Sequence, residues 1–106
     1  DRTTLTVDGL MRFARRELPT AGQSVVQLGA LAQEVLEDFE VPAGRRDIHL
    51  MRVGATGPAV RADREALRSA VANLAGNAVR LAPEGSTVVC GAGAQDEWAW
   101  IGVRGC

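Results

Sequence analysis

Two asparagines, Asn73 and Asn77, lie four residues apart in a stretch that is otherwise rich in alanine and apolar residues. On a helix, residues with this spacing lie one above the other, and Arg80, three residues further on, shares their side. Asparagine is a mediocre helix former, so two of them inside a helix indicate a polar role. Two amide oxygens and a guanidinium on one stripe have the chemistry to meet a metal ion and a phosphate together.

The element that must position these residues is a helix predicted from about Arg64 to Leu81. Asp63 is a suitable N-cap, and Pro83-Glu84-Gly85 predicts a turn after the helix. Apolar residues at helical spacing predict a core-facing stripe, made of Leu67, Val71, Leu74 and Ala78 and widened by Ala70 and Leu81. The two asparagines lie beside this stripe, at the edge of the predicted core.

The segment from Asp63 to Gly85 resembles the asparagine box of sensor histidine kinases, whose wider superfamily holds gyrase, the heat-shock chaperone ATPases and the mismatch-repair ATPases. The likeness rests on Asp63 and Leu67 ahead of the asparagines, and on the Asn73-Leu and Asn77-Ala pairs. A basic residue and a Pro-x-Gly sequence then follow in register. An asparagine pair alone is a weak pattern, but with these neighbours in register it is fairly specific.

The resemblance implies a site for Mg-ATP. It implies that Asn77 ligates the Mg²⁺ and that Asn73, one turn earlier, holds water or the shell of the metal. Arg80 stands where the family often has a basic residue near the phosphates, and Leu81 where it often has an aromatic residue beside the nucleotide. No residue of the chain is implied to be catalytic. On spacing alone, the alternative is that the asparagines merely bond helix ends or turn carbonyls, with Arg80 on the surface.

The chain departs from the family in its next box, which reads V-x-D-x-G-x-G and whose Asp recognises the adenine amino group. Here the sequence is Val103-Arg104-Gly105-Cys106, so Gly105 falls at the position of the Asp and offers no acceptor side chain. The later glycine-rich boxes and the lid over the phosphates are absent from these residues. We therefore expect the fragment alone to be inactive, to retain no ATP or Mg²⁺, and to gain no measurable stability from Mg-ATP.

The resemblance covers nearly the whole chain and implies an α+β fold: a two-layer α/β sandwich of the GHKL (Bergerat) type, incomplete, with an N-terminal helix. Val7, Leu10, Met11 and Ala14 recur at helical spacing and predict a helix from about Arg2 to Glu17. The sequence from Leu5 to Arg15 resembles the end of the second helix of a kinase dimerisation hairpin, and this resemblance implies that residues 1–18 are the end of the dimerisation helix. Residues 19–26 are predicted to be a linker. Residues 27–106 are interpreted as a partial ATP-binding domain, with the asparagine box at 63–85.

Within that domain, Gln27 to Glu40 reads as an amphipathic helix, and Pro42 to Asp47 as a turn. Strands are predicted at 48–53 and 59–62, separated by a loop at 54–58. After the asparagine box, strands at 86–91 and 97–103 are predicted to form an antiparallel hairpin around a loop at 93–96.

Composition is that of a folded domain: 106 residues, 46% hydrophobic, 24% charged, with a formal net charge of −1. The near-zero net charge argues against a surface that binds nucleic acid, and no apolar run is long enough to span a membrane. All twelve basic residues are arginines, so no lysine is present for Schiff-base chemistry.

The remaining residues with chemical potential have structural interpretations. Cys90 and Cys106 match no metal or disulfide spacing and are predicted to be a buried strand thiol and a chain-end thiol. His49, the one histidine, lies in a predicted strand and lacks the sequence context of the family's phosphoacceptor. Trp98 and Trp100 alternate on one strand face, which favours core or a partner-covered sheet face over base stacking.

The function that the resemblance implies for the parent protein is a two-component sensor histidine kinase, transferring a phosphoryl group from ATP to a histidine and on to a response regulator. We expect a cytoplasmic location, either for the whole parent protein or for the cytoplasmic part of a membrane-bound sensor. A homodimer is predicted, through the N-terminal helix or an exposed sheet face. Two alternatives stay open: a degenerate GHKL-type interaction module without ATP turnover, and an unrelated small α/β binding domain with a chance asparagine pair.

Overall fold

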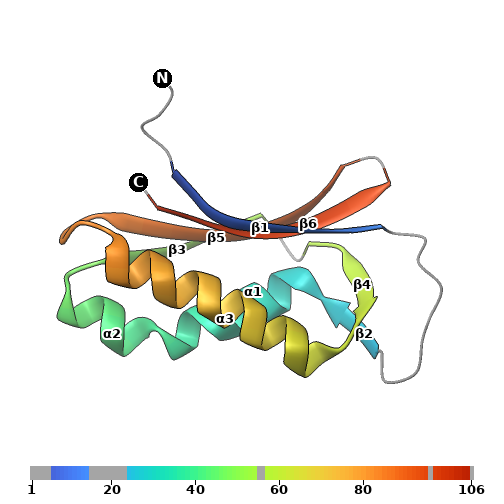
Figure 1. Ribbon diagram of the computed structural model, residues 1–106, viewed down its shortest axis with the longest axis horizontal. Coiled ribbons are helices and arrows are strands. Elements are labelled where there is room, and N and C mark those ends of the chain that lie inside the picture. Colours follow the sequence, from blue (N-terminus) through green and yellow to red (C-terminus); the bar gives the residue numbers. More distant parts are fainter. Residues whose placement is uncertain (1–5, 15–23, 55–56, 96, 106) are drawn as a thin grey trace.

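The protein, described by a computed structural model over residues 6–14, 24–54, 57–95 and 97–105, has two layers (Figure 1). One layer is a four-stranded sheet in the order β1 (Thr6–Ala14), β6 (Trp98–Gly105), β5 (Thr87–Gln95) and β3 (His49–Val53). The other holds three helices, α1 (Leu28–Asp38), α2 (Glu40–Arg45) and α3 (Arg64–Leu81). A two-stranded ribbon, β2 (Ser24–Gln27) with β4 (Ala59–Ala62), lies at one end of the helical layer. This arrangement confirms the predicted α+β sandwich.

The hydrophobic core lies between the two layers. Strand β6 alternates buried and more accessible residues along its length, as a strand with one covered face must. Its buried residues pack against α1 and α3. The largest fully buried side chains of the core are Leu28, Leu31, Ile101, Val26, Val35, Val71, Val88, Val103 and Cys90. The two longer helices, α1 and α3, thus pack against the sheet through their apolar sides.

Helix α3 begins and ends where the sequence predicts, but its buried face is broader and rotated. Ala75 and Val79 are buried, although they were not part of the predicted stripe. Leu81, predicted to widen the stripe, is 69% exposed. The difference arises because α3 packs against both α1 and the sheet, so two neighbouring faces of the helix are covered, whereas Leu81 at its end points away from both.

Residues 6–14 form a strand, so the helix predicted from Arg2 to Glu17 is wrong there; the rest of that span lies outside the described residues. Strand β1 pairs antiparallel with β6, with Met11 opposite Ile101. Leu10 and Arg12 are exposed while Met11 and Phe13 are half-buried, which is the alternation of a strand. The helical spacing led to a wrong prediction because the backbone of these residues pairs with the edge of β6, which lies about ninety residues later in the chain. The domain boundary drawn at residue 18 stays a prediction.

The other differences are local. The predicted linker at 19–26 includes the first three residues of β2, where Val26 is buried in the core; residues 19–23 lie outside the described part. The predicted turn at 42–47 overlaps the short helix α2, which begins at Glu40 and accepts Pro42 because this residue lies in the first helical turn. Strand β5 extends through most of the predicted 93–96 loop. The hairpin of β5 and β6 is confirmed, as are the strands at 48–53 and 59–62.

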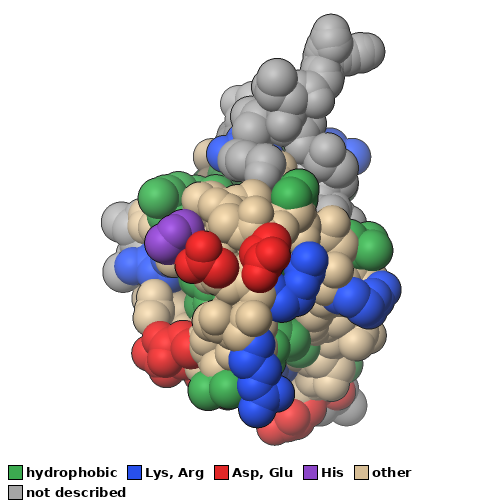
Figure 2. Space-filling model, turned by 90° about the vertical axis from the view of Figure 1, so that its left-hand side faces the viewer, with side chains coloured by type: hydrophobic (Ala, Val, Ile, Leu, Met, Phe, Trp, Pro, Cys, Tyr) green, Lys and Arg blue, Asp and Glu red, His purple; other side chains and the backbone are tan. Residues whose placement is uncertain are grey.

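The surface agrees with the near-neutral charge. At the end of the molecule where α2 and α3 finish, acidic and basic side chains are interspersed, without a field of one sign (Figure 2). No helix among the described residues is both long enough and apolar enough to cross a membrane.

Candidate functional site

The position of the asparagine-bearing helix is set at both ends. The Asp63 carboxylate accepts a hydrogen bond of 3.2 Å from the Ala66 amide, which confirms it as the N-cap of α3. At the other end the chain turns through Gly85, whose φ of +85° lies in the left-handed region that favours glycine. The Ser86 hydroxyl closes this turn by donating 2.6 Å to the Pro83 carbonyl. Helix α3 therefore starts and stops at defined points.

Asn73, Asn77 and Arg80 are all exposed and border one hollow of about 490 Å³ beside α3. The other residues of α3 that line the hollow are Ala72, Gly76 and Val79, and the region of α1 and α2 contributes Phe39, Pro42 and Arg46. The structure thus brings three of the four predicted site residues together. Leu81 does not line this hollow, so the two amides and the guanidinium form the polar part of its α3 wall.

Arg46 is a site residue that the sequence did not reveal. Its guanidinium donates to the carbonyl of Val79 and, at 3.0 Å, to that of Arg80. Carbonyls in the last turn of a helix have no partner within the helix, and a cation there also meets the negative end of the helix dipole. Arg46 therefore ties the end of α2 to the end of α3 and adds a second cation to the hollow.

The chemistry of these groups suits a metal-bound polyphosphate. Amide oxygens are ligands for a hard cation that keeps most of its waters, and guanidinium groups pair with phosphate oxygens. Among the described residues, no group of three or more His, Cys, Asp and Glu side chains is placed to hold a metal ion. A cation at Asn73 and Asn77 would therefore draw its other ligands from water and from the phosphates it accompanies.

No known family model matches the sequence, and no curated protein matches it either. Solved structures do match. Two nucleotide-free structures of the catalytic domain of histidine kinase ThkA superpose with TM-scores of 0.62 and 0.63, at 22% and 21% identity, over 69% and 70% of this chain. The cytoplasmic segment of histidine kinase QseC superposes with a TM-score of 0.62, at 26% identity, over 68% of this chain.

The chain has the fold of a histidine kinase catalytic domain. It spans about half the length of the matched chains: 51% and 49% of the two ThkA structures and 46% of QseC. The fold implied by the asparagine-box resemblance is therefore the fold that the structure matches.

In this kinase fold, an ion-pair network holds α3 against α1. The Glu34 carboxylate accepts 2.5 Å from Arg64 Nη2 and 2.8 Å from Arg68 Nε, and Arg68 also pairs with Asp38. These hydrogen bonds from Arg64 and Arg68 lower the pKa of Glu34 from 4.5 to about 2. The Glu34 side chain is still 39% exposed, so solvent screens the network, and its main effect is on the relative position of the two helices.

This network predicts a pH dependence of stability. Because the folded-state pKa of Glu34 lies below its ordinary value, its contribution is complete above about pH 4.5 and is lost as the pH falls toward 2. We expect the urea midpoint of the wild type to fall more steeply across that window than the midpoint of Glu34→Gln. Glu84→Gln, which removes an exposed carboxylate from the turn after α3, is the matched control and should follow the wild type. Parallel curves for the wild type and Glu34→Gln would contradict the assignment.

The remaining candidate groups have no part in the hollow. Cys90 is buried in β5, and burial raises the pKa of its thiol to about 11, so the predicted buried strand thiol is confirmed. Cys106 lies outside the described residues. His49 is exposed at the start of β3, which confirms the strand and surface setting predicted for it.

Proposed function

We propose that this chain supplies the asparagine-box half of a Mg-ATP site in a histidine kinase, and that it holds the phosphate end of the nucleotide. The supporting observation is that Asn73, Asn77 and Arg80 share one hollow on a helix of a histidine kinase fold. Phosphoryl transfer depends mainly on positioning and on neutralising phosphate charge, which is the kind of work these groups perform.

Each residue has a role in this proposal. The Asn77 amide oxygen ligates Mg²⁺, and Asn73 orients a water of the metal's shell. Arg80 donates to phosphate oxygens, and Arg46 keeps the last turn of α3 in place by holding its carbonyls. Bound magnesium, arriving with the nucleotide, supplies the positive charge that makes the terminal phosphate susceptible to attack.

Two residues outside the hollow indicate what this chain does not do by itself. Gly105 offers no acceptor side chain for the adenine amino group, and the one histidine, His49, lies on a strand rather than on a helix. We therefore propose that contact with Mg-ATP is weak and that the chain alone does not phosphorylate itself. In the whole protein, the phosphoryl group would pass from ATP to a histidine and then to a response regulator, in the cytoplasm.

The experiment that tests this proposal asks which part of the nucleotide the chain recognises. In ³¹P NMR, adding the chain should broaden the phosphate signals of Mg-ATP, and inorganic triphosphate with Mg²⁺ should compete as well as Mg-ATP does. Adenosine should not compete, because Gly105 cannot read the base. At about 1 mM Mg-ATP the melting temperature should not rise measurably, since a ligand stabilises only in proportion to ln(1 + [L]/Kd). Competition by adenosine, or a clear thermal shift, would contradict the proposal.

The second candidate is a degenerate module of the same fold that binds a partner without ATP turnover. Gly105 favours it, and so do the exposed apolar side chains of the sheet, Leu10, Met51 and Trp98. The two functions differ in one observable: the degenerate module predicts that Mg-triphosphate leaves Asn77 and its surroundings unaffected.

A further inference from the structure

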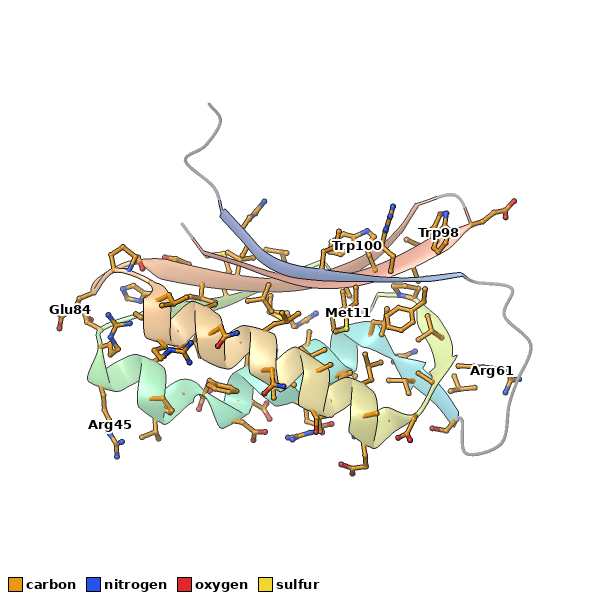
Figure 3. All side chains as sticks on the ribbon, in the orientation of Figure 1. Met11, Arg45, Arg61, Glu84, Trp98 and Trp100 are labelled. Atoms are coloured by element: carbon orange, nitrogen blue, oxygen red, sulfur yellow. The ribbon has the colours of Figure 1, made fainter. Side chains whose placement is uncertain are left out.

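The face of the main sheet that points away from the helices carries a second collection of recognition groups. Trp98 and Trp100 project from this outer face, whereas Met11 projects toward the helices (Figure 3). Four large apolar side chains on it are well exposed: Leu10, Met51, Val53 and Trp98. In the described part of the chain, no element covers this face (Figure 1).

The outer face is hollowed along a row of residues that runs across the strands. In this row Leu10 of β1 faces Gly102 of β6, Gly102 faces Gly91 of β5, and Gly91 faces Val53 of β3. The two central glycines put no side chain of their own on the surface, and the side chains of Val53 and Leu10 lean into the space that a Cβ would fill at Gly91 and Gly102. A groove of about 140 Å³ remains beside these side chains. Leu10 and Val53 stand at the two ends of the groove.

The neighbouring rows form the long walls of the groove. Trp100 lies on one side, next to Gly93, where its ring occupies the space that a Cβ would fill. Arg104 and Val89 lie opposite each other on the other side. The groove therefore has an aromatic wall and a wall that carries a guanidinium.

Arg104 is the polar group of the groove that lacks a partner. Its Nε is shielded from solvent and makes no hydrogen bond, and it is the one buried side-chain nitrogen or oxygen in the described residues of which this is true. A shielded donor of a charged group is costly without an acceptor, and a carboxylate is its strongest complement. A ligand that placed a carboxylate here would satisfy this donor.

Charge on the rest of the face agrees with an acidic ligand. Among the strand residues whose side chains the structure describes, the charged ones on the outer face are Arg104 and Arg12, and the guanidinium of Arg12 lies 5.5 Å from the centre of the Trp98 ring. The exposed Glu97 lies at the edge of this face, in the turn before β6. A second copy of the chain, packed face to face, would bring these cations together. Complementarity therefore favours a partner that carries negative charge beside apolar side chains.

We propose that the outer face binds a segment of another protein in which an Asp or Glu lies beside a bulky apolar residue. The apolar side chain enters the groove and packs against Leu10, Val53 and Trp100. The carboxylate meets Arg104, and further acidic residues reach Arg12. This surface is on the opposite side of the sheet from α3, so its occupancy leaves the Asn73–Asn77 hollow free.

A selection experiment with a built-in optical signal tests this proposal. A phage-displayed library of short random peptides is selected on the chain, and enriched peptides are synthesised and titrated. Both tryptophans of the chain, Trp98 and Trp100, lie on the outer face, so their fluorescence reports occupancy directly. We expect enriched peptides to pair Asp or Glu with a bulky apolar residue and to shift the emission to shorter wavelength.

Two matched variants identify the surface. Arg104→Gln should weaken binding of these peptides by about tenfold or more, because it removes the charged partner of the carboxylate. Arg61→Gln makes the same charge change on β4, in the helical layer, and should bind like the wild type (Figure 3). The proposal is overturned by a selection that enriches no acidic peptide, by equal binding to Arg104→Gln, or by a homodimer that buries both tryptophans.

Discussion

Asn77→Ala is expected to lower the affinity of the chain for Mg-ATP by about tenfold or more, which corresponds to about 1.4 kcal/mol for each factor of ten. The reason is that the amide oxygen at position 77 is proposed to ligate the metal, and alanine leaves that coordination position to water. Asn77 is exposed, so the substitution should change the free energy of unfolding by no more than about 0.5 kcal/mol. Phosphorus NMR titration measures the affinity, and urea denaturation measures the stability.

Ser69→Ala is the matched control for this variant. Ser69 is an exposed polar residue of the same helix, two turns before Asn77, and it does not border the hollow. It should bind Mg-ATP like the wild type. If Asn77→Ala bound Mg-ATP as well as Ser69→Ala did, the asparagines would have a structural role only, and an unrelated α/β binding domain would be the better interpretation.

Ile101→Ala is expected to produce the largest loss of stability, about 2–5 kcal/mol. Ile101 is fully buried in β6, which is a central strand with neighbours on both sides, so the cavity left by alanine cannot close easily. A domain of this size is stabilised by about 5–15 kcal/mol, so the loss takes a large share. Urea denaturation monitored by circular dichroism measures it.

Leu81→Ala is the control for Ile101→Ala, because it tests whether the loss of stability depends on burial or only on the type of side chain removed. It also shortens a large aliphatic side chain to alanine, but Leu81 is 69% exposed, so the expected change is within about 0.5 kcal/mol. Similar losses for the two variants would show that the core does not lie between β6 and the helices.

The sequence predicted best where local signals agree with one another. For α3, the N-cap Asp63, the run of helix formers and the Pro-x-Gly turn all specify one element, and the helix forms between the expected residues. The exposed side of α3 was also predictable, because Asn73, Asn77 and Arg80 share helical spacing. These three residues do border one hollow.

Features that depend on long-range pairing were not predictable. Leu10, Met11 and Ala14 fit a helical stripe as well as a strand, and the edge of β6 that decides between them lies about ninety residues away. Arg46 belongs to the site only because α2 ends beside the last turn of α3, more than thirty residues later in the chain. Leu81 illustrates the same limit, since periodicity cannot show which side of a last turn receives a neighbour.

The most direct test of the central claim, that the Asn73–Asn77 face meets the metal and phosphates of a nucleotide, is a ¹⁵N NMR titration with Mg-ATP. Asn73 and Asn77 are the only asparagines of the chain, so their side-chain amide signals can be assigned by substituting each in turn. We predict that both signals shift progressively as Mg-ATP is raised to about 10 mM, a range that detects millimolar affinity, and return when EDTA removes the metal. Amide signals that stay in place over the whole titration, while signals elsewhere move or none moves at all, would contradict it.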